Sequence, residues 1–538
     1  MKTRKFRFVI FSILIILLAN TSVILPIIAQ EDFVGKWRRY VISLPNNTYL
    51  GNPFALEVDC IFTHTSTGVS ITIPGYYAGN NTWKIAFMPT LIGEWTYATS
   101  SSDSDLTGVQ GTVVAVESGH RGMLKGDSIN LNKWKFADGN YVVPIALRME
   151  FFMEPASTSA FVAVADFMKK NNIHMLDTRL LEEDGQFENG RHDFIFNGNW
   201  QNHNFDLAVW DRMEERMEIL TEHGLGAHIM FYSDDAGKPG WSGKSITEAL
   251  VIRYVVARLA GYPTIWFNTG IDISEYRSQD DIDWWGRQIK SLDPYDHPIS
   301  SRYGGGSGSI VLSGQTFDSR GDNLAKINNM TSYFNISSVP VSFDDAWYEN
   351  SPQGIKRNKN YSEHDIRRAF WKLTISGGVG GLIRGFDGFF HINDVQTDLE
   401  SEEYLSLINP FIEANLGDTF GSMVPEPSLV SKGYAAADPQ RTKILYFFIG
   451  KNDRYDGGSS GNVIVKLYNY FMGNIDRYDG GSDGNVILKL SALNQTYIAT
   501  WYDPRSSKEM LLGSLSGGRD HVLTPPSTDD WILLLTQI

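Results

Sequence analysis

A chain of 538 residues is too long for a single hydrophobic core, so its length predicts two to four domains. A hydrophobic fraction of 42% and an aromatic fraction of 13% supply enough apolar surface for large cores, which excludes a disordered protein. A formal net charge of −15 argues against nucleic acid and anionic membrane surfaces as partners.

The first residues have the pattern of an export signal. The basic stretch MKTRKFRF precedes the apolar run VIFSILIILLA, and this order is typical of secretory signals. We therefore predict a signal peptide at residues 1–30 and a secreted or extracytoplasmic protein. The apolar run is nearly long enough to cross a bilayer, so an uncleaved segment that anchors the protein at the cell surface is the alternative. Cys60 is the only cysteine, which excludes an internal disulfide.

Residues 31–118 have the pattern of short strands separated by turns. Four stretches are rich in β-branched and aromatic residues, and glycine, proline or asparagine marks the breaks: FALEVDCIFTH, VSITIPGYY, TWKIAFMP and GEWTYATSS. No helical period interrupts them. The spacing predicts an antiparallel β-sandwich.

Strands and amphipathic helices alternate from residue 119 to residue 425. Eight strand candidates follow one another: YVVPIALRM, IHMLDTRLL, GAHIMFYSD, TIWFNTG, PISSRY, SIVLSG, VPVSFDD and VGGLIRGF. Ser245 and Glu248 have the spacing of a capping box at the start of one helix. Eight β/α units predict a (β/α)8 TIM barrel, although the GGGSG link between the fifth and sixth strands is too short for a helix.

Residues 426–538 return to the strand pattern, and we predict a second β-sandwich there. The segment contains a duplication, because DRYDGGSSGNVIVKL at 453–467 recurs as DRYDGGSDGNVILKL at 476–490 with two differences. Two copies are too few for a solenoid. The aspartates could offer oxygen ligands to calcium, but the EF-hand spacing is absent, so we predict solvated turns and neither a metal nor another cofactor.

Catalytic residues of a TIM barrel lie at the carboxyl ends of its strands. The polar and aromatic side chains expected at those ends include carboxylates, arginines and one tryptophan. They are Arg148, Glu150, Asp177, Arg179, Asp234, Asp235, Asp272, Arg302, Asp344, Asp345, Trp347 and Arg384. Taken singly, an acidic residue at a strand end is more often a helix cap or part of an ion pair, so only a pair of carboxylates indicates chemistry.

Cleavage of a glycosidic bond needs two carboxyl groups, one to donate a proton and one to act as nucleophile or base. Asp272 follows the fourth strand and Asp345 ends the seventh, nearly across the barrel mouth from each other. We predict that these two are the catalytic pair, with Asp344 as a positional substitute. The remaining polar residues of the set are predicted to bind the substrate.

The motifs of other enzyme classes are missing from the sequence. It has no HExxH, CxxC or P-loop lysine motif, and its 11 histidines are scattered. The pattern GxSxG occurs only in the two glycine-rich turns of the duplication, as GGSSG at 457–461 and GGSDG at 480–484, and not in the strand–turn–helix context that a serine nucleophile needs. His223 and His228 are close together, but we assign them to the start of a strand. A zinc enzyme or a serine hydrolase therefore has little support.

Three regions resemble the modules of one known arrangement. Residues 31–118 resemble the immunoglobulin-like DUF5060 domain through FMPTLIGEWTY and the junction SGHRGMLKGD. The barrel resembles the apiosidase-like (DUF4038) glycoside hydrolases. The C-terminal part resembles the collagen-binding-type β-sandwich that follows those barrels, through ATWYDPRSSKE and TPPSTDDWILLL. The resemblance implies a multidomain glycoside hydrolase whose TIM barrel is flanked by an N-terminal immunoglobulin-like β-sandwich and a C-terminal β-sandwich.

The resemblance also implies the two acids, with a change near each. Strand 4 of the family ends in Gly-Gly-Asp after a Trp, and here Trp266 is followed by FNTGID, which aligns Asp272 after one insertion. The second acid of the family is a Glu before a Tyr-Glu pair, and here Asp345 stands three residues before Tyr348. An aspartate is shorter than a glutamate by one C–C bond, roughly 1.5 Å. The wider separation of the carboxyl groups favours an inverting mechanism, and apiose is not carried over as the substrate.

The leading prediction is a secreted glycoside hydrolase that acts on a polysaccharide or its oligosaccharides. The strand-end arginines favour an anionic sugar, since guanidinium pairs with a carboxylate through two hydrogen bonds. A barrel that has lost its acids would instead be an exported carbohydrate-binding protein. A polysaccharide lyase with a Tyr or His base is a third alternative.

Overall fold

The computed structural model describes residues 32–130, 133–149, 156–181, 204–232, 243–270, 277–302, 314–316, 341–349, 360–376, 378–383, 400–431, 433–448 and 486–538, with Ile273 and Ile392. For the strands at 314–316, 341–349 and 378–383, the backbone alone is described. The predicted signal peptide and the first copy of the repeat lie outside these residues. In the described parts of the chain, no helix has both the length and the apolar character needed to span a membrane.

Seven strands form the N-terminal β-sandwich, in the order β1-β7-β6-β3-β4-β5-β2. β4 pairs with β3 near its start and with β5 near its end, so it belongs to both layers. Phe62 of β3 and Phe87 of β5 stack between the layers, with ring centroids 3.9 Å apart. The strands are β1 (Asp32–Gly35), β2 (Tyr40–Pro45), β3 (Val58–His64), β4 (Ser70–Tyr77), β5 (Thr82–Phe87), β6 (Gly93–Ser101) and β7 (Gln110–Val116).

Cys60 lies in the core of this sandwich. Its side chain is fully excluded from solvent. Burial raises the pKa of its thiol to about 12, because the apolar surroundings disfavour the thiolate. The thiol therefore behaves as a small apolar core group.

Eight parallel strands close into a barrel, which confirms the predicted (β/α)8 fold. Neighbours pair in chain order from β11 to β17, and β19 joins β17 to β11 and completes the ring. The strands are β11 (Ile145–Arg148), β12 (Met175–Leu181), β13 (Gly226–Tyr232), β14 (Ile265–Asn268), β15 (Ile299–Arg302), β16 (Gly314–Thr316), β17 (Val341–Glu349) and β19 (Gly378–Ile383). The short β18 (Asn360–Tyr361) pairs in parallel with the last two residues of β17.

Helices follow most of the barrel strands. They are α1 (Thr158–Lys170), α2 (Leu207–Glu222), α3 (Ile246–Leu259), α4 (Gln279–Leu292) and α8 (Glu363–Ser376), and then the short α9 (Glu400–Leu405), α10 (Ile408–Asn415) and α11 (Thr419–Ser422). The predicted capping box is present at the start of α3. The Ser245 hydroxyl accepts from the Glu248 N–H, and the Glu248 carboxylate accepts from the Ser245 N–H, both at 3.2 Å.

Replacement of Ser245 by alanine removes the acceptor of this cap and is expected to lower the free energy of unfolding by about 1 kcal/mol. Ser291, whose hydroxyl donates to the carbonyl oxygen of Gln288 on α4, offers a matched control. The same substitution there is expected to stay within about 0.5 kcal/mol, as is usual at the surface. Thermal unfolding checks both variants, and equal Tm values would contradict a contribution from the cap.

The predicted first barrel strand, residues 141–149, is divided in the structure. Its start forms β10 (Tyr141–Val142), which joins β9 (Trp134–Phe136) and β8 (Leu124–Gly126) in a small antiparallel sheet. Only the part after Pro144 enters the barrel as β11. Proline has no N–H to give to a strand ladder, which explains the break.

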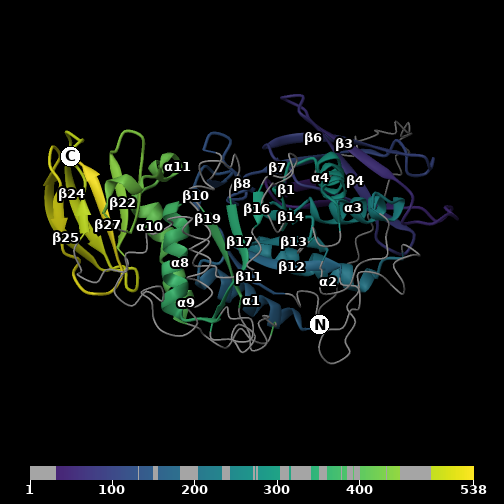
Figure 1. The fold of residues 1–538 in the computed structure, drawn as a ribbon. Helices are drawn as coiled ribbons and strands as arrows, with labels where there is room; N and C mark the ends of the chain where they lie inside the picture. The colour runs from purple at the N-terminus through teal and green to yellow at the C-terminus, as the bar shows by residue number, and fades with distance from the viewer. Residues whose placement is uncertain are drawn as a thin grey trace, which may run out of the picture.

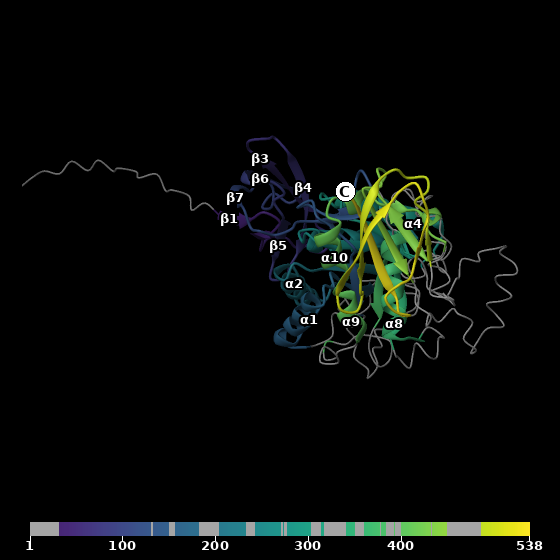
Figure 2. The ribbon, with the colours of Figure 1, turned by 90° about the vertical axis from the view of Figure 1, so that its left-hand side faces the viewer.

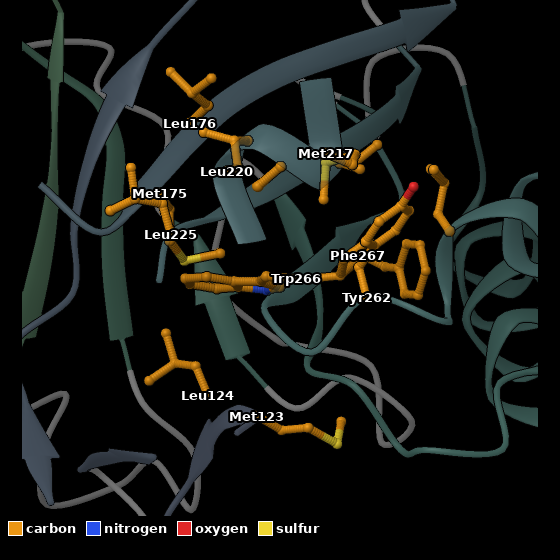
Figure 3. Close-up of a cluster of buried hydrophobic side chains, with 14 of the residues drawn as sticks. Met123, Leu124, Met175, Leu176, Met217, Leu220, Leu225, Tyr262, Trp266 and Phe267 are labelled. Carbon is orange, nitrogen blue, oxygen red and sulfur yellow. The ribbon is translucent and has the colours of Figure 1, made fainter. Parts of the chain in front are cut away.

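This small sheet covers the amino-terminal end of the barrel. Trp134 of β9 contacts Trp266 of β14, with ring centroids 4.6 Å apart. Figure 3 shows Met123 and Leu124 on one side of the Trp266 indole and Leu220 of α2 on the other. Because that end is filled by apolar side chains, the carboxyl ends of the strands are left for a functional site.

In the described part of the C-terminal region the chain forms two sheets, as predicted. The large sheet has the order β20-β21-β22-β27-β24-β25, and β23 pairs with β26 in the small one. Leu488 and Leu523 of the small sheet share a core with Tyr446 and Leu533 of the large sheet. The strands are β20 (Val424–Pro425), β21 (Tyr434–Ala437), β22 (Lys443–Phe448), β23 (Val486–Leu488), β24 (Thr496–Tyr502), β25 (Glu509–Ser516), β26 (His521–Leu523) and β27 (Trp531–Gln537).

The barrel lies between the two β-rich regions, with the N-terminal sandwich toward one end of the molecule and the C-terminal sheets at the other (Figure 1). A buried ionic cluster fixes the N-terminal contact. Arg39 lies 3.2 Å from the Glu214 carboxylate of α2, and Arg258 of α3 bonds the same carboxylate at 2.6 Å. Burial alone would raise the pKa of Glu214, but the two guanidinium groups outweigh it and hold the pKa below its usual value.

The C-terminal sheets dock on α8, which contacts β21 and β22. Figure 2 views the molecule from this side and shows the large sheet in front, with α8 and α9 below it. Arg367 of α8 donates two hydrogen bonds to Asp530, from Nε at 2.9 Å and from Nη2 at 2.6 Å. Arg368 adds a third from its Nε at 3.3 Å. All three side chains are at most 4% exposed, so this contact is a buried ion cluster.

Candidate active site

The barrel interior carries a layer of polar side chains next to Trp266. Strand register sets Asp177, His228 and Trp266 side by side on β12, β13 and β14, and sets Asn268 beside Ser300 on β14 and β15. His228 reaches Ser300 across the intervening strand β14, which places these side chains inside the barrel. Each is at most 4% exposed.

His228 is the centre of this polar layer. Its Nδ1 lies 3.2 Å from Oδ1 of Asp177. Its Nε2 lies 3.2 Å from Nδ2 of Asn268 and 3.3 Å from the Ser300 hydroxyl. The imidazole rests against the Trp266 indole, with ring centroids 4.4 Å apart. The ring is therefore hydrogen-bonded at Nε2, lies beside a carboxylate at Nδ1 and is packed on one face.

Asn268 connects the polar layer to the loop after β14. Its Oδ1 accepts a hydrogen bond from the Gly270 N–H at 2.9 Å. The next residue is held as well, because the Thr269 N–H donates to the Ser300 carbonyl oxygen at 2.9 Å. The backbone is thus fixed as far as Gly270, two residues before Asp272.

Two of the predicted arginines face the same interior. Arg148 pairs in register with Asp177, and Arg179 lies two residues further along β12 on the same face. Arg148 is 5% exposed and Arg179 is 8% exposed. The predicted substrate ligand Asp177 is 1% exposed and its carboxylate lies beside His228. Its role in substrate binding stays a prediction.

The seventh strand, β17, carries three predicted site residues. Asp344, Asp345 and Trp347 lie within its backbone, and their side chains lie outside the description. Pairing with β19 is interrupted there, since Phe343 pairs with Gly380 and the next pair is Trp347 with Leu382. Four residues of β17 thus span two of β19, and both aspartates fall in the irregular stretch. Such bulges re-aim side chains and are frequent at barrel rims beside active sites.

The other predicted residues are placed only in part. Arg302 is the last residue of β15. The remaining members of the set lie outside the described residues, namely Glu150, Asp234, Asp235, Asp272 and Arg384. Among the residues that the structure describes, no group of His, Cys, Asp and Glu side chains forms a candidate metal site.

Three residues of the polar layer were missed by the sequence analysis, namely His228, Asn268 and Ser300. A usable signal exists in the strands themselves. GAHIMFY and IWFN are apolar except for one polar residue each, and a polar residue inside a buried strand needs a partner. Strand-end counting does not find His228, because it lies near the start of β13.

Comparison with known proteins identifies two domains. Residues 33–102 match the family described as a domain of unknown function, DUF5060, and residues 172–403 match the family described as the apiosidase-like catalytic domain. The chain carries an apiosidase-like catalytic domain. By that domain it is a glycoside hydrolase, as the sequence resemblance implied. The collagen-binding-type resemblance of the C-terminal sheets stays a prediction.

Solved structures share the fold at low sequence identity. A candidate glycoside hydrolase from Bacteroides vulgatus is 18% identical and aligns over 94% of this chain and 100% of its own, with a TM-score of 0.70. A glycoside hydrolase of family 5 from Bacteroides vulgatus is 14% identical over 77% of this chain and 94% of its own, with a TM-score of 0.60. A search of curated proteins gave no significant match.

Proposed function

We propose that this glycoside hydrolase is secreted and cleaves glycosidic bonds in a polysaccharide or its oligosaccharides, with Asp272 and Asp345 as its acid and base. The observation that carries the assignment is the interrupted pairing of β17 at Asp344 and Asp345. A regular strand would send two consecutive side chains to opposite faces, whereas a bulge can re-aim one of them. The hydrogen-bonded backbone at Gly270, two residues before Asp272 in the sequence, supports the choice of the partner acid after β14.

The proposed substrate is an anionic sugar, a uronate or a sulfated residue. Arg148 and Arg179 support this proposal, because both belong to the interior face of the barrel and both are more than nine-tenths buried. A guanidinium group binds a carboxylate or sulfate through two parallel hydrogen bonds.

The test is a reducing-sugar release assay against matched neutral and anionic polysaccharides. The wild type is expected to release sugar from an anionic substrate, and the Asp272→Asn/Asp345→Asn double variant is expected to bind that substrate without cleaving it. Proton NMR of the first-formed anomer is expected to show inversion, because two aspartates set the carboxyl groups further apart than a glutamate pair. Binding without release by the wild type would instead indicate a carbohydrate-binding barrel, and an unsaturated product would indicate a lyase.

A further inference from the structure

The hydrogen bonds of the polar layer have a fixed direction, which begins at a backbone N–H. The Gly270 N–H can only donate, so the Asn268 side-chain atom that receives it is the carbonyl oxygen Oδ1. The amide nitrogen Nδ2 is then the atom that faces Nε2 of His228 at 3.2 Å. A flipped amide would set its two N–H bonds against the Gly270 N–H, which the geometry excludes.

The orientation of Asn268 determines the tautomer of His228. Because Nδ2 of Asn268 can only donate, Nε2 of His228 must accept, and its proton is therefore absent. The remaining ring proton is on Nδ1, which lies 3.2 Å from the Asp177 carboxylate. The Ser300 hydroxyl lies 3.3 Å from the same Nε2. The hydrogen bonds thus run in one direction, from Gly270 through Asn268 to His228, and Nδ1 of His228 lies beside the Asp177 carboxylate without hydrogen-bond geometry.

We propose that His228 is a positioning residue for catalysis, which acts through Asn268 to hold the backbone after the carboxyl end of β14 as far as Gly270. This proposal rests on the proposed function. The hydrogen-bond chain is buried, since His228 and Asn268 are at most 2% exposed. Water cannot replace a lost link there without a new cavity, so a break in the chain frees the Gly270 backbone.

Two substitutions at position 228 separate this role from simple packing. In His228→Gln, the side-chain oxygen can take the place of Nε2 and accept from Asn268. In His228→Asn, the shorter amide can take the place of Nδ1 beside Asp177, but nothing accepts from Asn268. We expect the Asn variant to lose kcat by about 10- to 100-fold at unchanged KM, because small displacements of a reacting group carry that cost. The Gln variant is expected to keep most of its kcat.

A merely structural role predicts a different outcome. Both variants would then lose activity in proportion to their loss in Tm, and Asn would not be worse than Gln. Equal kcat values in the two variants, or losses that follow Tm, would overturn the proposal. The wild type and both variants are measured as full chains. The substrate is the anionic polysaccharide that the release assay selects.

The hydrogen-bond chain itself is tested without activity. In protein labelled with nitrogen-15 at histidine, the signals that vanish in His228→Gln are expected to show a proton on Nδ1 and a bare Nε2 at neutral pH. Hydrogen exchange of the peptide that contains Gly270 is expected to quicken in Asn268→Ala. A proton on Nε2, or unchanged exchange, would overturn the chain. If the wild type cleaves no substrate, both the proposed function and the positioning role in catalysis are wrong. The two measurements above still show whether the hydrogen-bond chain exists.

Discussion

Replacement of Asp345 by asparagine is expected to lower kcat by about a thousand-fold with little change in KM. Asparagine keeps the size and one oxygen of aspartate, so substrate binding survives while proton transfer or nucleophilic attack is lost. The measurement is initial-rate kinetics on the substrate that the release assay selects. The kinetics are measured on Asp345→Asn alone, because β17 carries two candidate carboxylates in succession, Asp344 and Asp345.

The neighbouring variant Asp344→Asn is the matched control. It changes the same functional group one residue away, in the same irregular stretch of β17. If Asp344→Asn loses turnover and Asp345→Asn keeps it, the catalytic role belongs to Asp344. If both variants retain the wild-type kcat, a two-carboxylate mechanism through β17 is wrong.

Replacement of Asp530 by alanine is expected to lower the free energy of unfolding by about 3–5 kcal/mol. The carboxylate receives hydrogen bonds from Arg367 and Arg368 in a contact that excludes solvent. Its removal leaves two buried guanidinium groups without their shared counter-charge at the junction of barrel and C-terminal sheets. Calorimetry of the full chain measures the loss in the transition that includes this junction.

Asp529 supplies the control for this substitution. Its side chain is 43% exposed and pairs with Arg505 at 2.6 Å. Asp529→Ala is expected to cost no more than about 1 kcal/mol, which is the range of exposed ion pairs. Equal losses in the two variants would show that the buried cluster does not hold the C-terminal sheets.

The buried cluster of Asp530, Arg367 and Arg368 makes the free energy of unfolding depend on pH, and the sign of this dependence is defined. Burial alone would raise the pKa of Asp530, but the hydrogen bonds and charges of Arg367 and the charge of Arg368 outweigh it, so the pKa lies below its usual value. A depressed pKa in the folded state means that the stabilisation is complete above the pKa of the unfolded chain. It is lost as the pH falls through the folded value, and Asp530→Ala should not show this contribution.

Much of the barrel could be predicted because each strand and helix carries its own periodic pattern. The capping box of α3 is a local signal of this kind, and it was found at Ser245 and Glu248. The first strand was predicted to be too long, because the apolar run continues on both sides of Pro144 in the sequence. The proline instead separates a strand of the small sheet from β11.

The candidate site was predictable to a smaller extent, for a physical reason. Carboxylates at strand ends can be found one strand at a time, so Asp344 and Asp345 were assigned to the seventh strand, where their backbone lies. The polar layer depends on strand register, which brings Asp177, His228 and Asn268 together from three strands. No local pattern encodes that meeting, so His228 was assigned to the start of a strand and given no function.

Because the chain has a single thiol, opening of the N-terminal sandwich can be measured separately from the other domains. Cys60 is fully buried between the two sheet layers, and no second cysteine competes with it for reagent. A thiol-reactive dye can therefore label the native protein only during excursions that part those layers. The labelling rate then reports how often this one domain opens, in the presence of the barrel and the C-terminal sheets. A substrate that stabilises the contact between the sandwich and the barrel would lower the rate at which the dye labels Cys60.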